Sequence, residues 1–441
     1  MIPMRLSEIA EVVGGTHLGE DALITADLEF DSRKLQPGGL FAAFAGEKAD
    51  GHDFATGSPA AGVLGSRPTD LPTVVVKDVR DAMGVLAGHL LRRLPQLTVV
   101  GITGSSGKTS TKDLIGQLLA RLGPTIAPPG TFNNELGLPY TVLKADHETR
   151  FLVLEMGARG IGHITHLAGI APYQIAVVVN VGLAHIGEFG SVEAIAKAKS
   201  ELVRALPPDG LAVLNGDDPI VAAMAELSPA PVRIVHTPEV TLDEVGRPSF
   251  EVNGEKVTLQ LSGAHQVGNA LLAAAVATHC GLSDDELPAA LAGLRLISGR
   301  RMDVFDRADG VTVIDDSYNA NPSSTAVALK ALSALGRSRR TIAVLGYHAE
   351  LGDSERDGHA EVGALAAALG VDVVIVVEES AAPILDGAAS VRSWEGESVL
   401  VSDQAAAVSA LRQRLRPGDV VLVKGSRYRT WEVADSLRAA S

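Results

Sequence analysis

Residues 97–113, LTVVGITGSSGKTSTKD, decide the fold of this chain. The apolar run 97–102 predicts a buried β-strand, and a helical pattern over 108–122 follows it. The connecting loop and the start of the helix read Gly104, Ser105, Ser106, Gly107, Lys108, Thr109 and Ser110. In a strand–glycine loop–helix unit, backbone N–H groups and the helix N-terminus face a phosphate, the lysine reaches the outer phosphates and the threonine hydroxyl can ligate Mg²⁺. These seven residues are therefore predicted to bind ATP with Mg²⁺.

The motif is the short form T-G-x-x-G-K-T. Ile102 stands where the longer G-x-x-x-x-G-K-T form has its first glycine. A chance G-K-T in a surface turn is the alternative, but the strand and the helix both lie where a phosphate loop needs them.

The composition excludes several classes of protein. A length of 441 residues suggests three domains, since a domain has roughly 150 residues. The net charge of −15 argues against a nucleic-acid partner, because phosphate backbones attract basic surfaces. Cys280 is the only cysteine, which excludes an intrachain disulfide. The start of the chain lacks the features of a signal peptide, and no stretch nears the ~18 apolar residues that span a membrane. We therefore expect a cytoplasmic monomer without membrane insertion.

The pattern along the chain predicts an α/β fold in three domains. Residues 1–94 mix short helices and strands and form a smaller N-terminal α/β domain; they begin with an amphipathic stretch over 1–15, in which residues 6–13 are predicted to be helical. Residues 95–300 alternate helices with nearly continuous apolar runs, which is typical of a mostly parallel sheet covered on both faces. An Asn-Gly turn within 250–257 predicts a hairpin. Residues 301–441 repeat strand and helix, and predict a Rossmann-like, doubly wound C-terminal domain.

Polar residues follow the predicted strands of the central segment. Glu155 ends FLVLE, Asn180 ends IAVVVN, and His185 lies in the next loop. Lys199 and Glu201 lie on the helix after that. Open α/β sheets bind ligands at the carboxyl ends of their strands, so the glutamate and the histidine could hold Mg²⁺ near the phosphate loop. Taken alone, His185 also fits a hydrogen-bonded loop histidine, and Lys199 a solvated helix lysine.

Ten ordered segments of the chain resemble the Mur ligase family. They are TGSSGKTSTKD, TFNNELGLP, LEMG, NVGLAHIGEFGS, AKAKSEL, LNGDDP, HQVGNALLAAA, GRRMDV, VIDDSYNANPSS and KGSR. DDSYNANP and FNNELGLP are most similar to the member that adds D-alanyl-D-alanine to UDP-N-acetylmuramoyl-tripeptide. The resemblance implies a UDP-sugar-binding domain, a central ATPase domain and a C-terminal ligase domain. It implies amide-bond formation through an acyl phosphate, with ADP and phosphate as products, in peptidoglycan precursor synthesis.

The resemblance also implies roles at the ATP site. Lys108 would bind the β- and γ-phosphates. Thr109 and Glu155 would hold one Mg²⁺, and Glu155, His185 and a carbamylated Lys199 would hold a second. Carbamylation turns a cationic side chain into an anionic oxygen ligand. The predicted catalytic residues are therefore Lys108 and the three residues of the second metal site, Glu155, His185 and Lys199.

Further contacts are implied by the same resemblance. Those to the nucleotide are assigned to Asn269, Arg301, Asp316 and Tyr318. Those to the other substrates are assigned to Asp31, Ser32, Arg33, Asn133, Asn134, Asn319, Asn321 and Lys424. On the sequence alone, residues 31–33 also fit an ordinary polar turn.

The chain departs from the family after RTIAVLG. Tyr347 and His348 stand where the family has an acidic residue and a methionine. If this loop lines the amine pocket, the change alters which amine is accepted; neutral drift in a tolerant loop explains it equally well. A related amide ligase of specialised metabolism, with another acid or amine, therefore stays open as an alternative. A non-catalytic binding protein is a third hypothesis, but it would not need the complete set of metal-shell residues.

Overall fold

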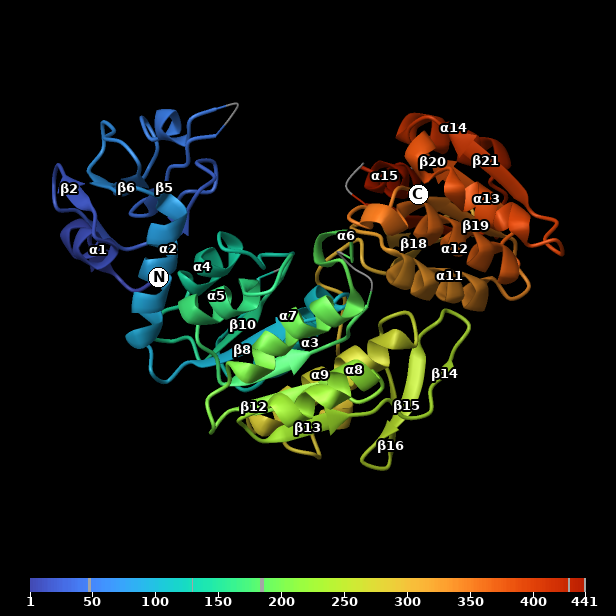
Figure 1. The fold of residues 1–441 in the computed structure, drawn as a ribbon, viewed down its shortest axis with the longest axis horizontal. Helices are drawn as coiled ribbons and strands as arrows, with labels where there is room; N and C mark the ends of the chain where they lie inside the picture. Colours follow the sequence, from blue (N-terminus) through green and yellow to red (C-terminus); the bar gives the residue numbers. More distant parts are fainter. Residues whose placement is uncertain (47–48, 129, 183–185, 427–428, 440–441) are drawn as a thin grey trace.

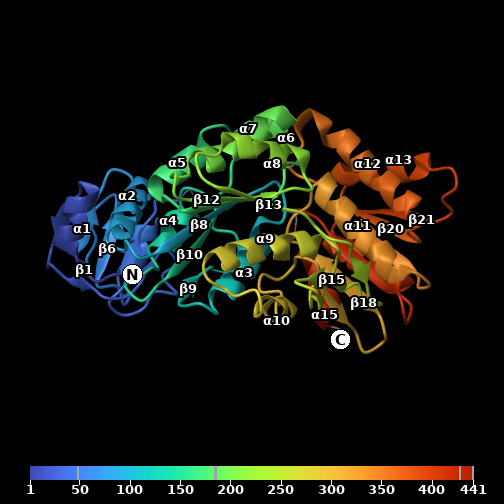
Figure 2. The same ribbon diagram turned by 90° about the horizontal axis from the view of Figure 1, so that it is seen from below.

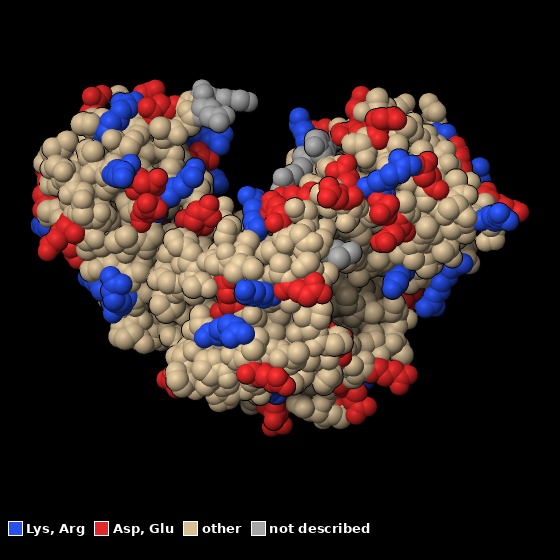
Figure 3. Space-filling model, viewed as in Figure 1, with Lys and Arg blue, Asp and Glu red and all other residues tan. Residues whose placement is uncertain are grey.

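The computed structural model describes residues 1–439 except 47–48, 129, 183–185 and 427–428. Its three larger sheets lie in successive stretches of the chain. Figure 1 shows them in a row, with the central part between the N-terminal and C-terminal parts. In Figure 3 the two outer parts rise on either side of an open gap above the central part, and acidic and basic side chains are interspersed on this face. The predicted three-part α/β architecture is therefore present.

The N-terminal part has a five-stranded sheet in the order β2-β7-β6-β5-β4 and a separate pair, β1-β3. Its elements are β1 (Met4–Arg5), α1 (Leu6–Val13), β2 (Thr16–Leu18), β3 (Leu23–Ile24), β4 (Leu28–Glu29), β5 (Leu40–Ala42), β6 (Gly62–Gly65), β7 (Thr73–Val75) and α2 (Val79–Arg92). Within the amphipathic stretch 1–15, α1 covers the residues 6–13 that were predicted to be helical. Met4 and Arg5 pair with β3, and Gly14, with a left-handed φ of 64°, ends α1 by donating to the carbonyls of Ala10 and Glu11.

The central part is built on a fully parallel six-stranded sheet in the order β13-β12-β11-β8-β10-β9. Its strands are β8 (Thr98–Thr103), β9 (Thr125–Ile126), β10 (Phe151–Glu155), β11 (Ile175–Val178), β12 (Leu211–Asn215) and β13 (Val232–Val235). Its helices are α3 (Lys108–Leu119), α4 (Gly137–Val142), α5 (His163–Ile170), α6 (Ile186–Phe189), α7 (Val192–Arg204) and α8 (Pro219–Ala222). Figure 2 shows α3 below this sheet and α5 and α7 above it. The apolar runs are thus buried on both faces, as predicted.

A small antiparallel sheet leads on to the C-terminal part. It contains β14 (Thr241–Leu242), β15 (Pro248–Val252) and β16 (Glu255–Thr258), and the predicted Asn253-Gly254 hairpin joins the last two strands. The helices α9 (His265–His279) and α10 (Leu287–Ala292) follow. Ten residues then lead to β17, and the predicted domain limit at residue 300 falls within this connection.

The C-terminal part has a six-stranded sheet in the order β17-β18-β22-β19-β20-β21. Its strands are β17 (Asp303–Asp306), β18 (Thr312–Asp316), β19 (Thr341–Leu345), β20 (Val373–Val377), β21 (Glu397–Val401) and β22 (Val420–Lys424). Its helices are α11 (Pro322–Gly336), α12 (Glu355–Ala368), α13 (Pro383–Ser390), α14 (Gln404–Arg414) and α15 (Trp431–Ala439). All pairs are parallel except β17-β18, an antiparallel edge that the sequence pattern did not predict. Apolar clusters on both faces of the sheet confirm the doubly wound arrangement.

The N-terminal and central parts share one apolar cluster, which includes Leu90 of α2 and Leu138 of α4. The buried carboxylate of Glu29 lies at the same boundary, where it accepts hydrogen bonds from Tyr140 Oη at 2.8 Å and Lys144 Nζ at 3.3 Å. Shared apolar packing and a satisfied buried charge join these parts firmly. Within the described residues, no helix is both long and apolar enough to cross a bilayer.

Candidate active site

The phosphate loop joins β8 to α3, as predicted. Gly107 is the last residue before the helix and has a left-handed φ of 76°. A Cβ at this position would lie 3.2 Å from Asn269 Oδ1 and 3.2 Å from a methyl carbon of Val179. Only glycine therefore combines this backbone conformation with the close approach of α9. The N-terminus of α3 faces the cleft between the central and C-terminal parts.

Asn180, which lies just after the neighbouring strand β11, holds the loop in place. Its Oδ1 accepts hydrogen bonds from the backbone N–H groups of Ser105 at 3.0 Å and Ser106 at 2.9 Å. Its Nδ2 donates to the carbonyl of Ser106 at 3.2 Å. The sequence placed Asn180 at a strand end but assigned it no role, because pairing with a loop about 75 residues away depends on β8 and β11 being neighbours.

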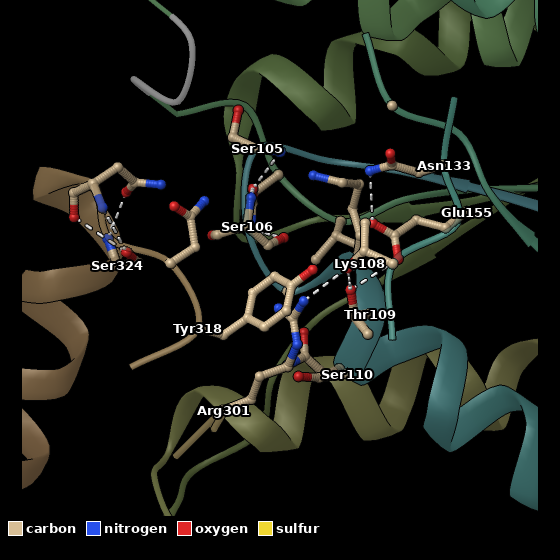
Figure 4. Close-up of a pocket in the computed structure, with 18 of the residues that line it drawn as sticks. Ser105, Ser106, Lys108, Thr109, Ser110, Asn133, Glu155, Arg301, Tyr318 and Ser324 are labelled. Carbon is tan, nitrogen blue, oxygen red and sulfur yellow. Dashed lines mark hydrogen bonds between the residues drawn. The ribbon is translucent and has the colours of Figure 1, made fainter. Parts of the chain in front are cut away.

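Lys108, Thr109 and Glu155 meet at the start of α3 (Figure 4). Lys108 Nζ donates to the carbonyl of Gly104 at 2.7 Å, and Thr109 Oγ1 donates to Glu155 Oε2 at 2.8 Å. Asn133 Nδ2 donates to the other carboxylate oxygen at 3.1 Å. Burial lowers the pKa of Lys108, while the charge of Glu155 opposes that shift. The site thus places hydroxyl and carboxylate oxygens beside a lysine at the loop, as the sequence predicted.

Lys199 is buried on α7, with 3% of its surface exposed. Burial first, and then the nearby charge of Lys108, lower its pKa well below the usual lysine value. Among the residues that the structure describes, no hydrogen bond or ion pair of the Lys199 ammonium is present. The solvated-lysine alternative is therefore wrong. His185 lies outside the described residues, and within those residues no group of three His, Cys, Asp or Glu side chains could hold a metal.

Residues of the C-terminal part form the opposite wall of the cleft. The Arg301 guanidinium lies 4.2 Å from the ring centre of Tyr318, and Nη2 donates to Thr131 Oγ1 at 2.9 Å. The buried ammonium of Lys424 pairs with Asp316 and donates to a backbone carbonyl. These cationic groups come together with the phosphate loop only in the folded chain.

Besides Asn133, the other four asparagines assigned by the resemblance also have partners within the protein. Asn269 Nδ2 donates to Gln266 at 3.0 Å, and Asn321 Oδ1 caps α11 by accepting from the N–H of Ser324 at 2.9 Å. Asn134 Oδ1 accepts from the N–H of Gly137, and Asn319 Oδ1 accepts from Ser426. All four asparagines line the cleft, so their ligand contacts stay predictions.

The cleft has a volume of about 1390 Å³, enough for a nucleotide and a second ligand. It is lined by the phosphate loop, Glu155, Asn180, Arg301, Tyr318 and Lys424, among others. His265 also lines it and was not predicted; burial lowers its pKa to about 4, which leaves it neutral at pH 7. Two smaller influences on this pKa come from the next domain, where Asp316 opposes the shift and Lys424 adds to it, so no local pattern in the sequence indicates this environment.

Residues 31–33 lie apart from this cleft, in the N-terminal part. Arg33 donates to Asp31 at 2.8 Å and lowers the pKa of that carboxyl to about 2. The Arg33 side chain is 87% exposed. The predicted nucleotide-sugar contact of Asp31, Ser32 and Arg33 therefore stays a prediction about a separate surface.

Tyr347 and His348 do not line the cleft either. His348 is fully buried, stacks on His359 with 4.8 Å between ring centres, and has Nε2 at 3.2 Å from Thr325 Oγ1. Tyr347 Oη donates to Glu355 at 2.5 Å. These contacts are internal to the C-terminal part, so the two side chains that prompted the alternative substrate face away from the cleft, although Glu350 of the same loop lines it.

Comparisons with known proteins agree with this geometry. Residues 102–277 match the Mur ligase middle domain, and residues 300–427 match the Mur ligase, glutamate ligase domain. The UDP-N-acetylmuramoyl-tripeptide–D-alanyl-D-alanine ligase of Mycobacterium bovis is 46% identical over 502 residues, with 100% of this chain and 98% of that protein covered. The Escherichia coli K12 protein of the same name is 35% identical, with 98% and 97% covered.

Solved structures show the same similarity. MurF from Acinetobacter baumannii superimposes with a TM-score of 0.86 at 29% identity and 99% coverage of both chains. MurF ligase from Thermotoga maritima in complex with ADP gives a TM-score of 0.78 at 29% identity, with 95% of this chain and 98% of that chain covered. Because these relatives match over the full length and both domain matches contribute walls of the cleft, the chain belongs to the Mur ligase family.

Proposed function

We propose that the chain joins D-alanyl-D-alanine to UDP-N-acetylmuramoyl-tripeptide at the expense of ATP, in peptidoglycan precursor synthesis. One observation carries the proposal. A phosphate loop with its lysine, threonine and partner glutamate opens into a large cleft between two domains, in a chain that aligns over its full length with ligases of that name. The relative from Thermotoga maritima holds ADP, which supports ATP as the nucleotide here.

The protein's main task is to position charge. The loop N–H groups and the N-terminus of α3 face the triphosphate, and Lys108 exchanges its bond to the Gly104 carbonyl for the outer phosphates. Arg301 adds a second cation from the opposite wall. Donors fixed before the reaction stabilise the charge on the transferring phosphoryl group without further reorganisation.

The residues present fit Mg²⁺. Thr109 Oγ1 and Glu155 Oε2 lie 2.8 Å apart in a buried position at the loop, and hydroxyl and carboxylate oxygens are the ligands that Mg²⁺ prefers. We propose that Thr109 and Glu155 hold one ion, and that Glu155, His185 and Lys199 hold a second. When bound, Mg²⁺ neutralises charge on the phosphate oxygens.

Lys199 fits this role only as a carbamate. An ammonium so buried and so close to Lys108 is disfavoured, and its lowered pKa leaves more of the neutral amine that reacts with CO₂. A carbamate would supply two oxygens that share one negative charge, at a place where the ammonium has no partner among the described residues. Electrostatics thus favour the modified side chain over the free one.

The chemistry proceeds in two steps. A carboxylate oxygen of the tripeptide attacks the γ-phosphorus, the bond to the β,γ-bridging oxygen breaks, and ADP leaves. The amine of the dipeptide then attacks the acyl carbon, loses a proton and expels inorganic phosphate, which leaves an amide. Water would hydrolyse the acyl phosphate, so the two domains that face each other across the cleft serve to exclude it.

Phosphate release tests the proposal. The purified protein is given ATP, Mg²⁺ and UDP-N-acetylmuramoyl-tripeptide, with D-alanyl-D-alanine or one of a panel of other dipeptides and amino acids. We expect release to depend on the tripeptide and to be fastest with D-alanyl-D-alanine, with the ligated product seen by mass spectrometry. Preference for another acid or amine would reject this assignment in favour of a related amide ligase.

A further inference from the structure

Arg301 is anchored outside its own domain. It follows the connection from α10, between Arg300 and Met302, whose φ values of 62° and 57° are left-handed. Its guanidinium reaches back to Thr131, which precedes α4 in the central part. The side chain therefore spans the two walls of the cleft.

Few contacts hold this guanidinium. One face lies over Tyr318, and Nη2 donates to Thr131 Oγ1. The buried Nε has no hydrogen-bond partner among the described residues. The charge of Arg301 also lowers the pKa of Lys108, which shows that the two cations are close. Arg301 thus keeps unused donor capacity beside the phosphate loop, and Thr131 is its one described hydrogen-bond acceptor.

The Thr131 hydroxyl also contacts Thr109, which with Glu155 is proposed to hold the first Mg²⁺ ion. Its Oγ1 lies 3.2 Å from Thr109 Oγ1, and Thr109 donates its own proton to Glu155. Thr109 can then only accept from Thr131, so the direction of each bond follows. Arg301 donates to Thr131, Thr131 to Thr109, and Thr109 to Glu155. We call these four residues the hydroxyl chain; such chains polarise one another, so each bond strengthens the next.

The backbone around Thr131 is fixed on both sides. The N–H of Gly130 donates at 3.0 Å to Ser298 Oγ, which lies within the connection between α10 and β17. The carbonyl of Asn133 accepts from the N–H of Gly157, just after β10, at 2.8 Å. The hydroxyl is thus held at a set distance from both the connection and the phosphate loop.

We propose that Thr131 is a positioning residue, which aims Arg301 at the transferring phosphoryl group and couples the placement of the C-terminal domain to the ATP site. The inference rests on the proposed ligase function. It assigns Thr131 no contact with substrate: its effect passes through Arg301.

Steady-state kinetics of Thr131→Val and Thr131→Ser test the inference. Valine keeps the shape but removes the acceptor, so we expect kcat/KM for ATP to fall about tenfold to a hundredfold, the loss typical of one hydrogen bond to a charged group. Serine keeps the hydroxyl and should restore most of the activity. Thr278→Val is the matched control, because Thr278 Oγ1 donates only to the carbonyl of Ala274 within α9.

A double-mutant cycle separates positioning from a general structural effect. If Thr131 acts through Arg301, Thr131→Val should cost little in an Arg301→Ala background, with thermal midpoints close to the parent proteins. Full additivity in that background, or wild-type kcat/KM in Thr131→Val, would overturn the inference. Failure of the wild-type protein to ligate any of the substrates would instead reject the proposed function.

Discussion

Lys199→Met should make the protein more stable while it abolishes ligation. The lysine is 3% exposed, faces the like charge of Lys108 and has no described partner. Methionine has a similar length and carries no charge. Replacing even a buried ion pair by apolar side chains of similar volume is often neutral or stabilising by about 1–4 kcal/mol, and a buried cation beside a like charge has no attraction to lose. At pH 7 without CO₂ we expect a gain in this range, which raises the thermal midpoint of a 441-residue chain by about 1 °C per kcal/mol.

The stability that Lys199→Met gains over the wild type should fall as the pH rises. The pKa of Lys199 is lowered in the folded protein, so between that pKa and the ordinary value of 10.5 the unfolded chain binds one more proton than the native one. The free energy of unfolding of the wild type therefore rises with pH across this window, and the variant lacks that slope. The advantage of Lys199→Met should accordingly shrink as the pH approaches 10.5.

Differential scanning calorimetry in CO₂-depleted buffer at pH 7 and pH 9 measures the effect. Lys197→Met is the matched control, since Lys197 is exposed on the same helix. Adding ¹³C-bicarbonate with Mg²⁺ should stabilise the wild type alone and produce a carbamate signal by NMR. Short carboxylic acids should partly restore ligation to Lys199→Ala. A Lys199→Met protein that is less stable than the wild type at pH 7 without CO₂ would refute the reasoning, because the lysine would then have a favourable partner.

Three further predictions concern the loop, the departure from the family and the domain boundary. Lys108→Met should lower kcat at least about 100-fold, since it removes one donor from the phosphoryl group, with an unchanged circular dichroism spectrum; near-normal turnover would remove the phosphate-loop assignment. The double substitution Tyr347→Glu with His348→Met should lower the melting temperature but keep the ratio of kcat/KM values between D-alanyl-D-alanine and other dipeptides, because both side chains pack within their own domain; a changed ratio would return this loop to the amine pocket. Tyr140→Phe should cost about 1–3 kcal/mol, because it removes the 2.8 Å bond to the buried carboxylate of Glu29, and chemical denaturation with an unchanged midpoint would contradict this.

Much of the fold could be predicted because its signals are local. The strand before the phosphate loop, the glycine at its end and the helix after it lie within 17 successive residues, and the structure follows them. The inner parallel strands, such as β10, β11, β19, β20 and β22, are short runs of mostly apolar residues, and the structure buries every residue in them. The antiparallel edge β17 was missed because DVFD has no strong strand pattern and becomes a strand by pairing with β18.

In the candidate site, likewise, residues with local signals could be predicted from the sequence and the others could not. Lys108 and Thr109 could be placed from sequence, since the loop that positions them adjoins them in the chain. Asn180, Thr131 and His265 could not, because each gains its role from a partner far away in sequence or in another domain. Lys199 shows the limit most clearly: on the sequence it also fits a solvated helix lysine, and only the packing of α7 buries it.

The sequence by itself determined the succession of strands and helices, the phosphate loop and the resemblance to the family, because these depend on residue order and on patterns a few residues long. Tertiary structure alone decided which residues share the cleft. The order of the central sheet places β8 between β10 and β11, so Glu155 and Asn180 flank the phosphate loop at adjacent strand ends. The C-terminal domain then brings Arg301 to Thr131, 170 positions away along the chain. Contacts over such separations form only when the packing of whole domains offsets the chain entropy lost in bringing them together.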